Sequence, residues 1–174
     1  MIVCLDSGNS RIKWGVHDGK QWLAQGALAH AEVKQLQQLL SDWPHPAKVM
    51  LANVAGAEAG ARIRERLGAW LPVLQEERSA HVRCGVTNHY LNPEKLGVDR
   101  WCALIGARGL SQTAAIVVMA GTATTIDTLD ADGNFLGGMI LPGGDLMRRA
   151  LAVDTAALPF ADGRHADYPR CTDD

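Results

Sequence analysis

The sequence has little net charge, no long apolar run and no closely paired cysteines, and each absence excludes a class of protein. Among its 174 residues, 17 lysines and arginines are balanced by 19 aspartates and glutamates, which gives a net charge of −2. This balance provides no electrostatic basis for binding nucleic acid or an anionic membrane surface. The longest apolar stretch, residues 114–120, is far too short to span a bilayer. We therefore expect neither nucleic acid nor a membrane among the partners.

Cysteine is scarce, and its spacing is uninformative for metal binding. No two cysteines form a C-x-x-C pair, and the four positions are Cys4, Cys84, Cys102 and Cys171. This spacing predicts reduced thiols and argues against a zinc site. Charged residues interrupt the N-terminal apolar run from residue 6 onward, so no secretory signal is expected. Together these features predict a cytoplasmic protein, and a hydrophobic content of 47% is enough for an ordinary globular core.

The most informative stretch is the first sixteen residues. Residues 2–5 are apolar and include β-branched side chains, which is typical of a buried strand. Residues 7–10 are small and polar, as in a tight turn. Apolar and polar residues then alternate over residues 11–16, the period of a half-buried strand. The pattern predicts two strands joined by a polar turn.

This turn has the chemistry of a phosphate-binding loop. Gly8 lets the backbone approach a ligand closely, and successive N–H groups with two hydroxyls can face anionic oxygens. Asp6 can bind a phosphate-associated Mg²⁺, and Lys13 adds positive charge. The sequence matches neither a Walker loop nor a G-x-G-x-x-G fingerprint. An ordinary hairpin, with Asp6 bonded to its own turn, remains an alternative at this point.

Residues 116–129 repeat the pattern: an apolar run meets a small-residue turn at Gly121 and Thr122, and a β-rich run follows. Aligning Gly8 with Gly121 superimposes the two apolar runs. Two such hairpins resemble the sugar kinase, actin and heat-shock ATPase superfamily. That resemblance implies a duplicated α/β fold of the ribonuclease H-like type, with one nucleotide held between the halves. The expected halves are residues 1–110 and residues 111–174.

The rest of the chain alternates between strand and helix patterns. Strands are expected at residues 21–29, 48–54, 82–84 and 135–141, and helices at residues 31–43, 57–70, 99–107 and 145–153. A helix between two strands implies a parallel pair with a right-handed crossover. The apolar positions of the last helix, Leu146, Met147, Ala150 and Leu151, are expected to face inward.

Asp99 and Arg100 stand at the start of an otherwise apolar helix. An aspartate here can simply accept backbone N–H groups and complement the helix dipole. Capping does not explain Arg100, because a cation is unfavourable at a helix N-terminus. The alternative is that Asp99 accepts a hydroxyl proton during phosphoryl transfer, while Arg100 holds an anionic substrate.

Four motifs in order identify a more specific family resemblance. They are Asp6-x-Gly8-Asn9-Ser10, Gly97-x-Asp99-Arg100, Gly121-Thr122-Ala123-x-Thr125-x-Asp127 and Gly137-Gly138-x-Ile140-x-Pro142-Gly143. This order resembles type III pantothenate kinase, also described as the Bvg accessory factor family, over nearly the whole chain. The resemblance implies transfer of the γ-phosphoryl group of ATP to pantothenate, the first step toward coenzyme A. It also implies Mg²⁺, a homodimer and an actin-like fold.

The resemblance assigns roles to individual residues. It implies an ATP phosphate loop made of Asp6, Ser7, Gly8, Asn9, Ser10, Arg11, Ile12 and Lys13, with Thr122 as a further phosphate contact. It implies a pantothenate site made of Tyr90, Gly97, Val98, Asp99, Arg100 and Thr172, in which Thr172 acts across the dimer interface. Asp99 would be the general base.

The sequence departs from the family pattern in two places. Relatives carry an aspartate that binds a monovalent cation, K⁺ or NH₄⁺, where this chain has Met119. Relatives also continue through a helical segment that completes the second half, so the second half is expected to look truncated here. Other readings are another small-molecule kinase of the superfamily, or a nucleotide-binding regulatory protein without turnover.

Overall fold

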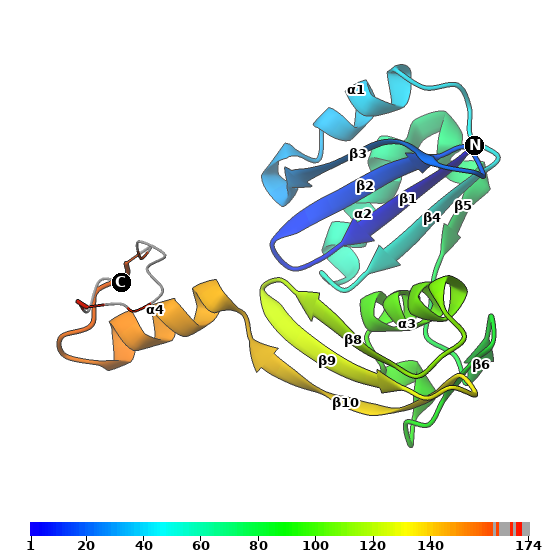
Figure 1. Cartoon of the computed structure of the whole chain (residues 1–174). Helices are drawn as coiled ribbons and strands as arrows, with labels where there is room; N and C mark the ends of the chain where they lie inside the picture. Colours follow the sequence, from blue (N-terminus) through cyan, green and yellow to red (C-terminus); the bar gives the residue numbers. More distant parts are fainter. Residues whose placement is uncertain (162, 164–167, 169, 172–174) are drawn as a thin grey trace.

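The computed structural model describes all residues except 162, 164–167, 169 and 172–174, and its strands form two sheets (Figure 1). The first sheet contains β1 (Ile2–Ser7), β2 (Arg11–His17), β3 (Trp22–Ala29), β4 (Lys48–Asn53) and β5 (Leu74–Glu76). The second contains β6 (Val82–Arg83), β7 (Val86–Asn88), β8 (Ala115–Ala120), β9 (Ala123–Leu129) and β10 (Asn134–Pro142). The predicted mixed α/β fold is confirmed.

The helices connect and cover these strands. The α-helices are α1 (Gln35–Ser41), α2 (Ala57–Leu67), α3 (Val98–Leu110) and α4 (Gly144–Asp154). Short 3₁₀ helices occupy η1 (His30–Glu32), η2 (Gly68–Val73) and η3 (Pro93–Lys95). The first two α-helices are shorter than the sequence predicted. Gly68 has a φ of +51°, a backbone conformation that ends α2.

The first sheet has the order β3-β2-β1-β4-β5. β1 pairs antiparallel with β2, which confirms the expected hairpin, and the parallel pairs β1–β4 and β4–β5 confirm the expected parallel arrangement. Val3 and Leu5 of β1 are buried with Leu36 of α1 and Ile63 of α2 in one hydrophobic core. This core fixes the C-terminal end of β1, where Asp6 lies.

The second sheet repeats the three-strand meander of the first, with the order β6-β7-β10-β9-β8. β8, β9 and β10 pair antiparallel, as β1, β2 and β3 do. Within the described residues, β8 is an edge strand, whereas its counterpart β1 pairs with β4. The change of sheet lies between β5 and β6. The boundary between the two halves, which we expect at residue 110, stays a prediction.

Helix α3 lies between the two sheets and contacts β4 of the first as well as β8 and β9 of the second (Figure 1). Its Trp101 and Leu104 are buried with Leu129 and Phe135 in a second hydrophobic core. The N-terminus of α3 is therefore fixed from both sides. This is the position at which Asp99 and Arg100 occur.

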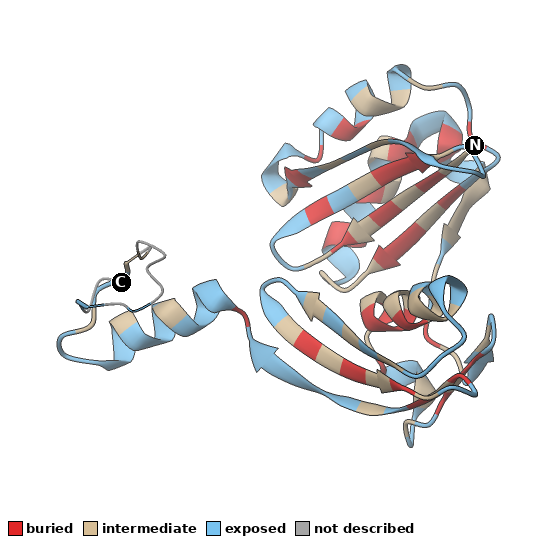
Figure 2. Cartoon of the chain, in the orientation of Figure 1, coloured by how far each residue is buried: buried red, intermediate tan, exposed pale blue. Residues whose placement is uncertain are grey.

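The prediction that the apolar residues of α4 face inward is wrong for the described structure. The helix extends away from the second sheet, and Figure 2 shows its surface as mostly exposed. Leu146, Met147 and Leu151 are each about half exposed, and Ala150 is exposed as well. The amphipathic period predicts a helix correctly, but the period cannot specify whether another segment covers its apolar face. None of the helices in the described part is long and apolar enough to cross a membrane.

Candidate active site

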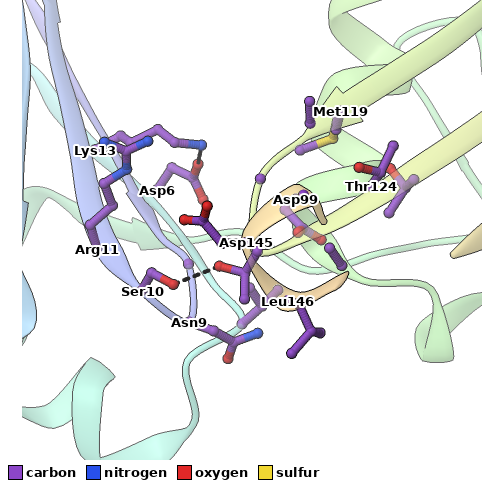
Figure 3. A pocket seen from close by; sticks show the side chains of 18 of the residues that line it. Asp6, Asn9, Ser10, Arg11, Lys13, Asp99, Met119, Thr124, Asp145 and Leu146 are labelled. Carbon is purple, nitrogen blue, oxygen red and sulfur yellow. Dashed lines mark hydrogen bonds and ion pairs between the residues drawn. The ribbon is translucent and has the colours of Figure 1, made fainter. Parts of the chain in front are cut away.

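A cavity of ≈ 890 Å³ lies where the two sheets face one another, and both predicted turns line it (Figure 3). The β1–β2 turn contributes one wall, and the β8–β9 turn contributes the opposite wall. The starts of α3 and α4 complete the lining through Asp99 and Asp145. Residues that are far apart in the sequence thus converge on one space, as the resemblance to a nucleotide-binding cleft implied.

The β1–β2 turn presents charged and polar groups to the cavity. Lys13 donates to Asp6 through an Nζ–Oδ2 contact of 3.1 Å, and the Asp6 side chain is 33% exposed. The turn is closed by the Gly8 N–H, which donates to the Arg11 carbonyl at 3.2 Å. Asn9 also lines the cavity. Asp6 is therefore held at the end of β1 with part of its carboxylate available to a ligand.

Two residues of the predicted phosphate loop do not reach the cavity. Ser7 and Ile12 are fully buried, and they pair with one another across β1 and β2. The Ser7 hydroxyl has no hydrogen-bond partner among the described residues. These two side chains support the hairpin from within the core.

The two turns are joined directly by a hydrogen bond. The hydroxyl oxygens of Ser10 and Thr122 lie 2.6 Å apart, and either can be the donor. Figure 3 shows this contact as a dashed line that starts at Ser10, next to Asn9. A ligand anion placed between the turns would meet a hydroxyl from each sheet.

The start of α3 brings Asp99 to the cavity. Asp99 is half-buried, and its Oδ1 accepts the backbone N–H of Arg100 at 2.8 Å. A Cβ atom on Gly97 would lie 2.6 Å from this oxygen, so glycine at this position leaves room for the carboxylate. Val98 is buried beside it. Asp99 is therefore bonded to the helix backbone and also lines the cavity, a position compatible with either of the roles considered from the sequence.

Arg100 is buried rather than free in the cavity. Its Nε donates to Asp127 Oδ2 at 3.1 Å, its Nη2 donates to Asp127 Oδ1, and its Nη1 donates to the Tyr90 hydroxyl at 3.0 Å. The hydrogen bond to Asp127 raises the pKa of the Arg100 guanidinium. Tyr90 is thus brought to Arg100, but neither residue lines the cavity itself.

The site includes residues to which the sequence assigned no role. Asp127 is fully buried under the Arg100 guanidinium. Thr125 lines the cavity with a buried hydroxyl that has no partner among the described residues. Both belong to the motif that runs from Gly121 to Asp127. Because they are two positions apart on β9, their side chains lie on the same face of the strand. Asp145 and Arg149 line the cavity from α4, and no sequence pattern indicated this.

Met119 lines the cavity at the end of β8 and is half-buried. It occupies the sequence position at which the family resemblance implies a cation-binding aspartate, and its thioether is a weak acceptor. Among the described residues, no three His, Cys, Asp or Glu side chains are grouped so that they could hold a metal ion. Thr172, the remaining predicted substrate contact, lies outside the described residues.

The charges that line the cavity are mixed in sign. Positive side chains are Arg11, Lys13 and Arg149, and negative side chains are Asp6, Asp99 and Asp145. Such a lining suits a polyanion that carries a divalent cation, because each sign finds a partner. Asp6 has the carboxylate chemistry that Mg²⁺ prefers, and the nearby hydroxyls suit phosphate oxygens.

Solved structures of other proteins share this fold at low sequence identity. A putative Baf family transcriptional activator from Campylobacter jejuni has a TM-score of 0.56 and 22% identity, covering 98% of this chain and 69% of that one. A putative 2-dehydro-3-deoxygalactonokinase from Sinorhizobium meliloti has a TM-score of 0.50 and 18% identity, covering 87% and 57%. This likeness shows that the chain has the same mixed α/β, actin-like fold as these proteins.

Similarity in sequence is far stronger. A type III pantothenate kinase of Dechloromonas aromatica (strain RCB) is 73% identical over 174 residues, which are 100% of this chain and 73% of that protein. The type III pantothenate kinase of Aromatoleum aromaticum is 53% identical, covering 100% of this chain and 72% of that protein. The family profile described as type III pantothenate kinase matches residues 2–174. The chain therefore belongs to the type III pantothenate kinase family.

Proposed function

We propose that this protein phosphorylates pantothenate with ATP, giving 4′-phosphopantothenate, the first step of coenzyme A biosynthesis. The observation that carries the proposal is the convergence of both phosphate-type turns and Asp99 on one cavity. Phosphoryl transfer depends mainly on positioning and on neutralisation of charge, and little covalent chemistry is asked of the protein. The convergence of two polar turns with a carboxylate satisfies this requirement.

The β1–β2 turn and Thr122 are the proposed site of the ATP phosphates. Backbone N–H groups near Gly8 and the hydroxyls of Ser10 and Thr122 would donate to phosphate oxygens. Lys13 supplies a positive charge next to Asp6, 3.1 Å away. Asp6 would hold Mg²⁺, which supplies neutralisation of the phosphate charge when it is bound. These residues orient the γ-phosphate toward the start of α3.

Asp99 is the proposed general base. Its Oδ1 is occupied by the backbone N–H of Arg100, and this bond fixes the carboxylate in one orientation. The cavity-lining carboxylate can then accept the proton of the substrate hydroxyl as the new P–O bond forms. Gly97 keeps the space beside this carboxylate free of a side chain.

The pantothenate site is proposed to lie beside the first turn of α3. Gly97 and Val98 would form its backbone wall, Tyr90 an aromatic wall, and Arg100 a partner for the carboxylate of pantothenate. Thr172 of a second copy would complete the site. The guanidinium suits this role because planar N–H groups pair well with a carboxylate.

We also propose that the protein is a cytoplasmic homodimer. The apolar stretch of α3 supports the second point, because Ala103 and Ile105 are only half-buried within a single chain. A second copy could cover this surface and bring Thr172 to the site. Sedimentation that shows only monomer at micromolar concentration would contradict the dimer without affecting the proposed reaction.

A substrate panel tests the reaction. The protein is incubated with ATP, Mg²⁺ and pantothenate, with several sugars, or with no acceptor, and both ADP and the phosphorylated product are measured. We expect ADP and product in equal amounts with pantothenate alone. Product from a sugar would instead indicate another small-molecule kinase. ATP binding without turnover on any acceptor would indicate a regulatory protein.

A further inference from the structure

The ion pair between Arg100 and Asp127 is the most deeply buried pair of charges in the described structure. The exposed fractions of the two side chains are 6% and 0%, while every other ion pair between described residues includes a side chain that is at least 39% exposed. Removing two charges from water is costly, and apolar residues of similar volume often stabilise a protein equally well. A contribution to the stability of the fold therefore does not by itself explain why these two charges are buried.

The guanidinium of Arg100 is fixed in one orientation. Two of its N–H groups donate to Asp127, one donates to the Tyr90 hydroxyl, and its Cζ lies 5.8 Å from the Tyr90 ring centroid and 5.9 Å from that of Phe135. A guanidinium has five N–H groups and three of them are used in these hydrogen bonds, so two remain for another acceptor. Asp127 has no exposed surface, so any ligand contact must pass through Arg100.

The neighbouring strand keeps the space for this arrangement. Gly138 of β10 pairs with Asp127 of β9. A Cβ atom at position 138 would overlap Asp127 Oδ1 and would lie 3.0 Å from Arg100 Nη2. Glycine at this position therefore allows the carboxylate and the guanidinium to meet in the sheet face that α3 covers.

We propose that Asp127 is a positioning residue for substrate binding: it holds the Arg100 guanidinium so that its remaining N–H groups receive the carboxylate of the substrate. This inference rests on the proposed function, because it takes pantothenate as the substrate. Asp127 touches no ligand itself. Its effect is selectivity for an acceptor that carries a carboxylate, and the effect is exerted through Arg100 alone.

A pair of ligands that differ only in the carboxylate tests the inference. Pantothenate and pantothenyl alcohol, in which a primary alcohol replaces the carboxylate, are titrated by calorimetry with a non-hydrolysable ATP analogue present. For Asp127→Asn we expect about tenfold or greater loss of affinity for pantothenate, because hydrogen bonds to charged groups are strong. Affinity for the alcohol and for the nucleotide stays unchanged. The matched control is Asp132→Asn, an exposed aspartate of the β9–β10 turn, which should change neither affinity.

A second variant keeps the test decisive if Asp127→Asn fails to fold. Arg100→Met combined with Asp127→Leu replaces the pair by apolar residues, a change that buried ion pairs often tolerate. This double variant should bind the alcohol as the wild-type protein does and should bind pantothenate no better than the alcohol. In an Arg100→Met background, Asp127→Leu should cause no further loss of pantothenate affinity.

The outcomes separate this inference from the proposed function. Equal loss of affinity for both ligands, or unchanged preference for pantothenate in Asp127→Asn, would overturn the positioning role while leaving the kinase assignment intact. The losses of pantothenate affinity caused by Arg100→Met and by Asp127→Leu should not add up in the double variant. If they do add, Asp127 acts independently of Arg100 and the inference is overturned. If the wild-type protein neither binds nor phosphorylates pantothenate, the proposed function fails and the inference fails with it.

Discussion

The hydroxyls of Ser10 and Thr122 lie 2.6 Å apart although 112 residues separate them in the chain. One belongs to the β1–β2 turn and the other to the β8–β9 turn, so this contact marks where the two sheets meet at the cavity. In the proposed reaction, both hydroxyls would donate to phosphate oxygens of ATP. Because the two oxygens are this close, a single phosphate group bound between the turns would lie within reach of both hydroxyls.

Removing these hydroxyls tests the phosphate site. Ser10→Ala and Thr122→Val should each raise the KM for ATP about tenfold or more, because a hydrogen bond to a charged group contributes about 1.5–3 kcal/mol. The KM for pantothenate should stay near its wild-type value. Steady-state kinetics measure both constants, and Ser111→Ala, a hydroxyl outside the cavity, serves as the control. An unchanged KM for ATP in both variants would remove these hydroxyls from the phosphate site.

Asp99→Asn separates catalysis from helix capping. Loss of a general base lowers turnover by about 10²–10⁴-fold, while asparagine can still accept the Arg100 N–H. We expect the thermal midpoint and the ATP affinity to change little while kcat falls within this range. The measurements are kcat, nucleotide titration and a melting curve. Near-normal turnover combined with lower stability would assign Asp99 to capping.

Met119 tests the dependence on a monovalent cation. A thioether is a soft, weak acceptor and cannot replace a carboxylate for K⁺ or NH₄⁺. We expect turnover to differ little among potassium, ammonium, sodium and a bulky organic cation at equal ionic strength. Met119→Asp should gain dependence on potassium, because it adds a carboxylate to the cavity. A large, saturable activation of the wild-type protein by potassium would contradict this prediction.

The β9–β10 turn gives a prediction about pH. The side-chain hydrogen bond from Asn134, followed by the backbone N–H groups of Asn134 and Asp132, lowers the pKa of Asp130 in the folded state from its ordinary value. A lowered folded-state pKa stabilises the protein above the unfolded-state pKa, and this stabilisation is lost as the pH falls through the folded-state value. Asp130→Ala should therefore be less stable than wild type at neutral pH.

The difference in stability should shrink as the medium becomes acidic. Urea unfolding at about pH 7 and in steps below pH 4 measures it. Asp132→Ala removes a carboxylate from the same turn without these hydrogen bonds and serves as the control. A stability difference that stays constant across the acidic range would show that Asp130 acts through packing rather than through its charge.

The sequence predicted local structure well where a period or a turn is encoded by neighbouring residues. The alternation over residues 11–16, the apolar runs before Gly8 and Gly121, and the start of α3 near Asp99 all lie where they were expected. These signals are local, because side-chain period and turn chemistry depend on residues a few positions apart. The same local signals predict the positions of both phosphate-type turns.

The environment of Arg100 was not predictable in this way. Its sequence position suggested a cation that faces an anionic substrate, but the structure buries it against Asp127, 27 residues further along the chain. Asp127 lies on β9, and only the packing of α3 against the second sheet brings the two together. Sequence spacing carries no information on such a contact, because it arises from the packing of separate elements.

The exposure of the apolar face of α4 was unpredictable for the same reason. Its apolar period specified a helix with two different faces, and this helix formed at Gly144–Asp154. Whether Leu146 and Met147 are covered depends on which other segment packs there, and no described segment does.

By itself, the sequence thus determined most of the elements, the two phosphate-type turns and the family, but it missed the short strands β5 and β7. Only the tertiary structure decided which side chains share the cavity and which are buried beneath it. The reason is physical: hydrogen bonding and side-chain period act between near neighbours, whereas burial and ion pairing depend on surfaces that meet only when α3 and the two sheets pack together.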